Sequence, residues 1–378
     1  MREFKFNILL LSVALLLGSC ASRQVQSNSE RKIWTKQQAA DWYKKQGWLV
    51  GSNFMPSNAI NQLEMFQAET FDAATIDKEL GLAQSLGMNT MRIFLHDIVF
   101  DQDSTGFYRR IDTVLNLCRK HNIKPLLVFF DSCWDPFPKA GKQRSPKPHV
   151  HNSGWVQSPG YHSLQDSTQY PRLEKYVKSV VAKFAGDRRI LGWDIWNEPD
   201  NDTGPAYRKV DLPDKVNYVI PLLKRSFAAA RSSNPKQPLT SGIWVGDWTT
   251  HEGLKPIEKV QIEESDVISF HSYDKPDEFE KRIKLLQRYG RPILCTEYMA
   301  RPQGSTFQGF LPIAKKYNVA MMNWGFVSGK SQTIYPWDSW TKTYTAEPAI
   351  WFHDIFKTDG TAYISEETDF IKDITSSK

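Results

Sequence analysis

Eight short apolar runs recur along the chain, and longer segments with helical periodicity separate most of them. Most of the runs are continuously apolar, as expected for parallel strands that are covered on both faces. Strand, helix and strand in repetition form right-handed βαβ units, and eight such units close most naturally into a barrel. The expected strands are residues 48–53, 89–95, 125–130, 190–196, 239–244, 266–271, 292–297 and 319–325. The expected helices are residues 75–86, 107–121, 172–185, 214–233, 277–289 and 306–317.

An open, doubly wound sheet is the competing architecture, but no Gly-x-Gly-x-x-Gly motif follows the first strand. The 378 residues suit one large barrel, which needs about 250 residues before loop insertions. Two long stretches, 131–165 and 326–350, follow the third and eighth strands, at the face where barrel active sites are built. We therefore predict an α/β fold: a single-domain (β/α)8 TIM barrel with long loops after strands 3 and 8.

The first twenty residues have the features of an export signal. Arg2 and Lys5 precede an apolar run at residues 8–17, which is too short to span a membrane as a stable helix. The following Leu17-Gly18-Ser19-Cys20 resembles the lipobox of bacterial lipoproteins, in which the cysteine is diacylated and becomes the mature N-terminus. This predicts a lipid-anchored protein of the bacterial cell envelope, periplasmic or at the outer-membrane surface. The alternative is an ordinary secretory signal with an incidental Cys20.

The same features divide the chain into three parts. We predict a lipoprotein signal peptide over residues 1–20, a flexible polar tether over 21–33 and the barrel over 34–378. The membrane partner follows from the lipid anchor at Cys20.

Charge and cysteine content argue against two other classes of protein. The formal net charge of +6 is spread along the chain without a basic arm, so we expect no nucleic-acid partner. Beyond the leader, Cys118, Cys133 and Cys295 are an odd number, which argues against a disulfide framework. No Cys or His spacing indicates structural zinc. We expect a monomer with no cofactor and no metal.

Two glutamates end strands on the same face of the predicted barrel. The fourth strand ends in Trp196-Asn197-Glu198-Pro199, and the seventh in Thr296-Glu297-Tyr298. Two carboxylates facing each other across a barrel mouth are what glycosidic cleavage needs, since one donates a proton while the other attacks the anomeric carbon. A lone glutamate is most often a solvated surface group, but that interpretation must explain both positions at once.

With these motifs the chain resembles clan A glycoside hydrolases, and most closely family 5, the cellulase and mannanase family. The resemblance implies that Glu198 is the acid/base and Glu297 the nucleophile of a retaining mechanism. It also implies that Asn197 holds the 2-hydroxyl of the sugar and that Arg92, within Met91-Arg92-Ile93-Phe94, positions the nucleophile.

Two further family positions match near the later strands. In Ser269-Phe270-His271-Ser272-Tyr273, the resemblance gives Tyr273 a hydrogen bond to the nucleophile and His271 a contact with the acid/base or the sugar. Trp324, at the end of strand eight, matches the tryptophan that floors the −1 subsite.

The chain departs from the family after strand three, where a histidine is usual. The sequence reads Phe130-Asp131-Ser132-Cys133-Trp134, so Asp131 or a histidine of the following loop, His149 or His151, is expected to serve instead. This departure leaves the subfamily open.

Several other side chains are candidates for binding. Asn53 ends strand one and either contacts substrate or forms a strand-end hydrogen bond. About half of Trp134, Trp155, Trp248 and Trp337 are expected to be sugar platforms, Trp134 among them, and the rest to pack under loops. The carboxylates Glu64 and Glu69 follow strand one and could bind hydroxyl groups.

The sequence thus predicts a retaining glycoside hydrolase acting on a β-linked poly- or oligosaccharide, such as a β-glucan or β-mannan. One alternative is a non-catalytic carbohydrate-binding lipoprotein with the same barrel. Another is a metal-dependent hydrolase built on His96, His149 and His151. The identity of the glycan and the choice between endo and exo attack depend on loop shape, which the sequence leaves open.

Overall fold

A computed structural model of the chain describes residue 1 and residues 31–376. The predicted lipidation site Cys20 and residues 21–30 of the predicted tether lie outside the described residues. Arg31, which the sequence analysis placed in the tether, forms an ion pair with Asp266 and donates to the carbonyl of Gln237 at 3.3 Å. Contacts with the barrel are therefore already present at Arg31, two residues before the expected boundary at 33.

Eight parallel strands among the described residues form a nearly closed barrel, which confirms the predicted fold class. Their order in the sheet is β5-β4-β3-β2-β1-β8-β7-β6. Hydrogen bonds from Asp266 N to Leu239 O (2.8 Å) and from His271 N to Ile243 O (3.0 Å) join the two ends of the sheet. The strands are β1 (Val50–Phe54), β2 (Thr90–Phe94), β3 (Lys124–Asp131), β4 (Gly192–Asn197), β5 (Leu239–Thr240), β6 (Ile268–His271), β7 (Ile293–Glu297) and β8 (Ala320–Asn323).

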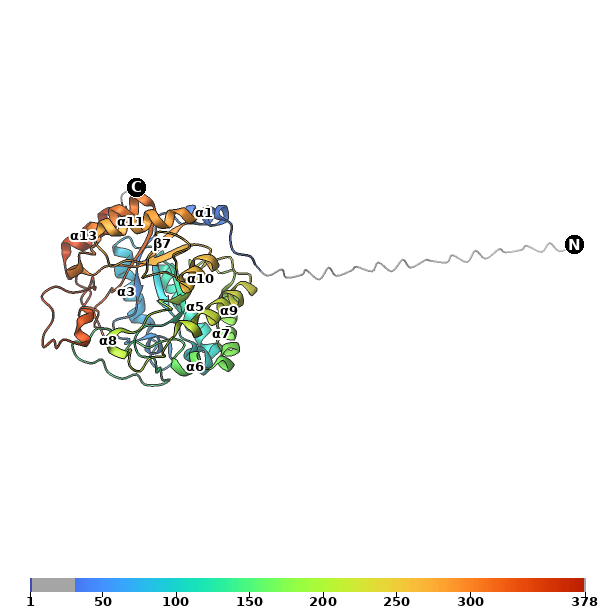
Figure 1. Ribbon diagram of the computed structural model, residues 1–378, viewed down its shortest axis with the longest axis horizontal. Coiled ribbons are helices and arrows are strands. Elements are labelled where there is room, and N and C mark those ends of the chain that lie inside the picture. Colours follow the sequence, from blue (N-terminus) through green and yellow to red (C-terminus); the bar gives the residue numbers. More distant parts are fainter. Residues whose placement is uncertain (2–30, 377–378) are drawn as a thin grey trace.

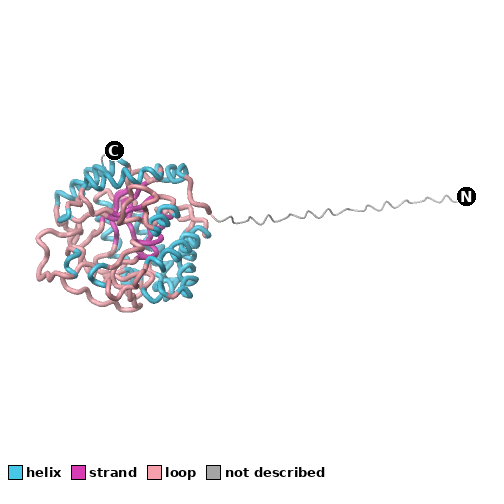
Figure 2. Tube along the Cα trace, in the orientation of Figure 1, coloured by secondary structure: helices cyan, strands magenta, loops and turns pink. Residues whose placement is uncertain are grey.

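Helices surround the strands, which occupy the interior of the molecule in Figures 1 and 2. None of the helices in the described part of the chain combines the length and apolar character needed to cross a membrane. The α-helices are α1 (Lys36–Lys44), α2 (Gln62–Phe66), α3 (Ala73–Ser85), α4 (Asp97–Gln102), α5 (Ser104–Lys120), α6 (Tyr161–Gln165), α7 (Tyr170–Phe184), α8 (Gly204–Tyr207), α9 (Val216–Ser232), α10 (Pro256–Glu264), α11 (Pro276–Leu286), α12 (Phe307–Tyr317) and α13 (Ser365–Ser376).

Alternation along the strands separates two apolar regions. On β2, Met91 and Ile93 join the large core between strands and helices, whereas Arg92 between them is buried among polar groups inside the barrel. A second, smaller cluster includes Leu126 and Leu294 and packs against residues of α1. The barrel therefore has an apolar base, and the polar groups of the site lie nearer the carboxyl ends of the strands.

Two long segments follow the strand ends, as predicted. The β3 loop comprises residues 132–160, between β3 and α6, and the β8 loop comprises residues 324–364, between β8 and α13. Both contribute to the cavity above the barrel.

Candidate active site

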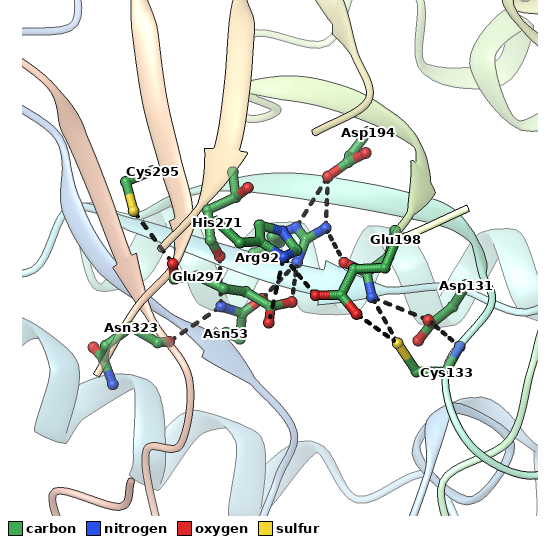
Figure 3. Close-up of polar contacts among 12 residues, drawn as sticks. Asn53, Arg92, Asp131, Cys133, Asp194, Glu198, His271, Cys295, Glu297 and Asn323 are labelled. Atoms are coloured by element: carbon green, nitrogen blue, oxygen red, sulfur yellow. Dashed lines mark hydrogen bonds and ion pairs between the residues drawn. The ribbon is translucent and has the colours of Figure 1, made fainter. Parts of the chain in front are cut away.

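The guanidinium of Arg92 lies at the centre of the site. Its Nε and Nη2 donate to Asp194 Oδ2 at 3.0 and 2.8 Å, and its Nη1 donates to Glu297 Oε1 at 2.8 Å (Figure 3). Nη1 also donates to Asn53 Oδ1 at 3.1 Å, and Nη2 to Asn197 Oδ1 at 2.7 Å. A fully buried cation with this many partners is held in one orientation, so Arg92 fixes residues from β1, β4 and β7 relative to one another.

Asn53 takes the second of the two roles considered for it. Its Nδ2 donates to the carbonyls of Thr296 (2.8 Å) and Asn323 (3.1 Å), while its Oδ1 accepts from Arg92. Both ends of the amide are thus engaged, and Asn53 does not line the cavity above the glutamates. These contacts favour the strand-end role: Asn53 ties Arg92 to β7 and β8.

Glu198 follows β4 in a left-handed backbone conformation, with φ of 42°. Its Oε1 lies 2.8 Å from Nδ1 of His271. Its Oε2 accepts from Asn201 Nδ2 at 2.6 Å and from the Cys133 thiol at 3.3 Å. Three groups from β6, β4 and β3 or their following loops therefore set the position of this carboxyl group.

Glu297 is the last residue of β7, and it faces Glu198 across the site. Besides Arg92, it accepts a hydrogen bond at Oε2 from the Tyr273 hydroxyl, at 2.9 Å. One oxygen of each glutamate and a ring nitrogen of His271 all lie within 4.8 Å of one another. Figure 3 shows the two glutamate side chains reaching toward each other from opposite sides. The structure thus brings both predicted catalytic carboxylates together.

The electrostatic environment distinguishes the two glutamates. Burial raises the pKa of Glu198 to about 7. Burial also raises the pKa of Glu297, although Arg92 opposes that shift. Burial lowers the pKa of His271 to about 4, so its imidazole is neutral at neutral pH. Arg92 donates directly to Glu297 and stabilises its ionised form. When the two glutamates hold one proton between them, that proton is therefore more stable on Glu198, and the negative charge is more stable on Glu297.

Asp131, which was expected to take the place of the family histidine after strand three, has a different role. Asp131 is buried; its oxygens accept from Asn197 Nδ2 at 3.0 Å and from Trp155 Nε1 at 2.7 Å, and it does not line the cavity. It therefore positions these two side chains, which corrects its assignment to substrate binding. The side chain beside the predicted acid/base is instead Cys133, whose Sγ also lies 3.5 Å from Asn197 Nδ2.

The loop histidines do not replace the missing family histidine at the acid/base either. His149 Nδ1 lies 2.6 Å from the Tyr335 hydroxyl, and His151 Nδ1 lies 2.9 Å from the Tyr335 carbonyl oxygen. His96 Nε2 lies 3.1 Å from the carbonyl oxygen of Gln157. His151 lines the cavity, but the three histidines considered for a metal site form no common cluster among the described residues.

An aromatic cavity of about 280 Å³ lies above the two glutamates. Trp324 packs edge-on against Phe94 and Trp155, with ring centroids 5.8 and 5.4 Å apart. Trp134 stacks on Trp340 at 5.4 Å with an interplanar angle of 15°. Flat apolar rings are suited to the apolar faces of sugars. The aromatic lining residues are Trp134, Trp155, Trp244, Tyr273, Trp324, Trp337 and Trp340.

The remaining candidates lie away from the cavity. Trp248 is buried in the large core, edge-on to Phe270, and is one of the tryptophans that pack under loops. Glu64 accepts from Lys330 Nζ at 2.6 Å and from the backbone of Ile60. Neither Glu64 nor the exposed Glu69 lines the cavity, so both are removed from the candidate hydroxyl-binding groups.

Three residues that contact Arg92 or Glu198 were not identified from the sequence. Asp194 had a usable signal, because a carboxylate inside the apolar run of β4 must find a buried partner. The Cys133 thiol had no sequence signal for a functional role beyond its place after β3, since cysteine is usually an inert, buried small side chain. Asn201 lies in an irregular segment, where no periodicity predicts which way a side chain points.

We expect the Cys133 thiol to tune the pH dependence of the site. Burial holds the pKa of the thiol well above its usual value, so it remains an S–H donor to Glu198. That hydrogen bond favours the ionised form of Glu198. Cys133→Ala should therefore raise the pKa of Glu198 and move the alkaline limb of the kcat/KM profile to higher pH. The change in the maximum should be less than about tenfold, as expected for one hydrogen bond.

The Cys133 prediction has two matched controls. Cys133→Ser keeps a hydrogen-bond donor, so the pH of its alkaline limb should lie closer to that of wild type. Cys118 lies in the core on α5, so Cys118→Ala should leave the pH of the alkaline limb unchanged. An alkaline limb that stays in place or moves to lower pH in Cys133→Ala would contradict the assigned role.

Comparisons with known proteins agree with this geometry. The family model described as Cellulase (glycosyl hydrolase family 5) matches residues 55–342. A curated relative, mannan endo-1,4-beta-mannosidase A of Hypocrea jecorina, is 22% identical over 219 residues, which are 53% of this chain and 48% of the relative. The chain thus spans about half the length of the curated relative it matches.

Solved structures share the fold at low sequence identity. A GH5_18 protein from Streptomyces cattleya in complex with GlcNAc has a TM-score of 0.58 at 13% identity, over 87% of this chain and 79% of that chain. An exo-beta-1,4-mannosidase from Opitutaceae bacterium strain TAV5 gives 0.57 at 17% identity, over 87% and 60%. The hyperthermostable endo-1,4-beta-D-mannanase from Thermotoga petrophila RKU-1 gives 0.52 at 14%, over 86% and 99%.

Proposed function

Because the chain belongs to glycosyl hydrolase family 5, we propose that it is a retaining glycoside hydrolase that cleaves β-glycosidic bonds. The observation that carries this proposal is the approach of one carboxyl oxygen of Glu198 to one of Glu297, within 4.8 Å. Retaining enzymes hold their carboxyl groups about 5–5.5 Å apart, whereas inverting enzymes need about 6.5–9.5 Å to admit a water molecule. The observed spacing supports a covalent intermediate.

In the first step, a carboxylate oxygen of Glu297 attacks the anomeric carbon of the sugar. The bond from that carbon to the glycosidic oxygen breaks, and the departing oxygen takes the electron pair together with the proton of Glu198. Arg92 keeps Glu297 ionised and oriented, and Tyr273 donates to its second oxygen. The raised pKa of Glu198 keeps this carboxyl group protonated up to about pH 7.

In the second step, water attacks the anomeric carbon from the side that the leaving group has vacated. Glu198, now ionised, takes a proton from the water, and the bond between the sugar and Glu297 breaks to restore the carboxylate. The neutral His271, 2.8 Å from Glu198, can hold this group in place in both protonation states. Two inversions at the same carbon give net retention.

For the substrate, we propose a β-linked glycan with mannose as the first sugar to test. The curated relative is named a mannan endo-1,4-beta-mannosidase, and two of the similar structures are described as a mannosidase and a mannanase. The test is hydrolysis of aryl β-mannosides and aryl β-glucosides by the purified protein, with the anomeric configuration of the first product followed by NMR. A β-configured first product supports retention; an α-configured one contradicts it, and no hydrolysis of any β-glycoside or β-glycan overturns the proposal.

We also propose that the enzyme is anchored to a bacterial envelope membrane through lipid on Cys20. The support is the export signal and the lipobox-like Leu17-Gly18-Ser19-Cys20. Cys20→Ala should move most of the enzyme from the detergent phase to the aqueous phase in phase partitioning, because the acyl chains supply the membrane affinity. Cys118→Ala is the matched control and should remain in the detergent phase. A Cys20→Ala protein that still partitions into detergent would refute the anchor.

A further inference from the structure

The β3 loop and the β8 loop are joined by hydrogen bonds into one continuous wall. The backbone N–H of Asn152 donates to the carbonyl of Ser331 at 2.9 Å. The side-chain amide of Gln332 donates to the carbonyl of Lys147 at 2.7 Å. Because β3 and β8 are separated in the sheet by β2 and β1, this junction extends across the carboxyl ends of both intervening strands.

Residues that follow β1 also hold the β3 loop through hydrogen bonds. Asn61 Nδ2 donates to the carbonyl of Gly154 at 2.8 Å, and Gln62 Nε2 donates to the carbonyl of Val156 at 3.2 Å. Asn61 and Gln62 belong to the segment that follows β1 and starts α2. The β3 loop is therefore held against the barrel, and it is not an arm extended into solvent.

The two sides of the cavity differ in exposure. On the wall, His151 and Asn152 are 1% exposed and Trp155 is 2% exposed, although all three line the cavity. On the opposite side, the lining residues Asp202 and Pro205, which follow β4, are exposed. The lining residues that the β3 loop contributes are thus buried, and the exposed lining residues lie beside β4.

The proposed acid/base indicates which end of a substrate faces the closed side. Glu198 follows β4, and it protonates the oxygen of the leaving group, so the leaving group lies toward the solvent-facing side. The sugar attacked by Glu297 then points its other end toward the wall. In that direction the junction of Asn152 with Ser331 and of Gln332 with Lys147 lies in the path of further sugars.

We propose that the protein acts at chain ends, releasing one sugar at a time from the non-reducing end of short β-linked oligosaccharides. This inference rests on the proposed hydrolase function and adds its mode of attack. Interior bonds of a polysaccharide would require sugars on both sides of the scissile bond, and the joined β3 and β8 loops occupy one of those sides.

The test compares two forms of the same β-1,4-linked tetrasaccharide, one with a free non-reducing end and one capped at O4 of that end. Hydrolysis of the free form should give monosaccharide as the only initial product, and kcat/KM for the capped form should be at least 100-fold lower. Equal cleavage of both forms, or initial products of intermediate length, would overturn the chain-end mode while leaving the hydrolase function intact. Failure to cleave the free tetrasaccharide, aryl β-glycosides and β-glycans would overturn both.

A variant of the wall provides a second measurement. Trp337→Ala removes a half-buried ring of the β8 loop that packs on Phe352 and His353 and lines the cavity; Trp340 is less suitable because it also packs on Tyr207 of α8, beside β4. Trp337→Ala should raise the ratio of capped to free kcat/KM by about tenfold or more, and this ratio is independent of the fraction of folded enzyme. Trp42→Ala on α1 is the matched control, since Trp42 packs against Trp34 and Tyr43 away from the cavity. An unchanged ratio in Trp337→Ala would refute the role of the wall.

Discussion

Glu297→Ala is expected to lower kcat/KM for every glycoside substrate by roughly 10⁴-fold or more, because it removes the group that forms the covalent intermediate. No other carboxylate among the cavity-lining residues is placed to replace it, since Glu198 must donate the proton and Asp202 is exposed beside β4. Steady-state kinetics on an aryl β-glycoside would measure the loss.

The Glu297→Ala protein should remain folded. Arg92 keeps its ion pair with Asp194 and its hydrogen bonds to Asn53 and Asn197, so its buried charge stays compensated. Removing one of two close carboxylates also relieves repulsion. Thermal unfolding should therefore lie near that of wild type.

Azide should restore part of the lost activity in Glu297→Ala. The shortened side chain leaves room for a small anion on the face that Glu297 attacked, so the product from a β-glycoside should be an α-glycosyl azide. The matched control is Glu64→Ala, which removes a carboxylate from outside the cavity and should leave kcat/KM unchanged. Wild-type turnover in Glu297→Ala, or rescue that yields a β-azide, would contradict the assignment of the nucleophile.

Strand and helix positions were predictable because burial on both faces produces continuous apolar runs and amphipathic helices. Each of the six expected helices matches an observed one, for example 75–86 against α3 and 306–317 against α12. The fifth strand is shorter than expected. Pairing with β4 stops at Thr240, since the backbone N–H of Ser241 donates to the Ser265 hydroxyl at 3.2 Å and the Ser241 hydroxyl donates to the carbonyl of Trp196 at 2.8 Å. Beyond it, Ile243 forms an isolated bridge with Phe270 of β6.

Seven of the described α-helices were not predicted: α1, α2, α4, α6, α8, α10 and α13. In α1 the buried face consists of Ala39 and Tyr43 alone, and most of its remaining residues are polar or charged, so the segment has little apolar content to mark it as a core-facing helix. What holds the helix in place is the apolar base of the barrel, a contact between segments that are distant in the chain. Tertiary packing thus supplies what the local pattern lacks.

The residue types at the strand ends predicted the catalytic candidates, whereas contacts between loops determine the shape of the cavity. The positions of Glu198 and Glu297 follow from strand ends that converge on one face. The hydrogen bond from Asn152 to Ser331 and the stacking of Trp134 on Trp340 join residues that lie roughly two hundred positions apart in the chain. No periodicity in the β3 or β8 loop encodes such pairing, so the closed side of the cavity is visible only in the structure.

Glu198→Ala is expected to lower kcat/KM on oligosaccharides by on the order of 10²–10⁴-fold, the usual contribution of a general acid. The loss should depend on the leaving group. A sugar alkoxide leaves poorly without a proton, whereas a dinitrophenolate is stable on its own, so aryl glycosides with such groups should retain near wild-type kcat/KM. The measurement is kcat/KM across aryl β-glycosides of graded leaving-group pKa, for which the dependence should be much steeper in Glu198→Ala than in wild type.

The second step gives Glu198→Ala a distinct signature. Without its base, water attacks the glycosyl-enzyme slowly, so dinitrophenyl glycosides should show a burst followed by a slow phase. Azide needs no base, and it enters from the side opposite Glu297, so it should accelerate the slow phase and give a β-glycosyl azide. The alkaline limb near pH 7 should also disappear from the kcat/KM profile for the dinitrophenyl substrate, since burial sets that pKa on Glu198 itself. Equal losses of kcat/KM on oligosaccharides and dinitrophenyl glycosides, or an α-azide product, would assign the acid/base role to another residue. Only loss of the proton donor lowers kcat/KM more for poor leaving groups than for good ones.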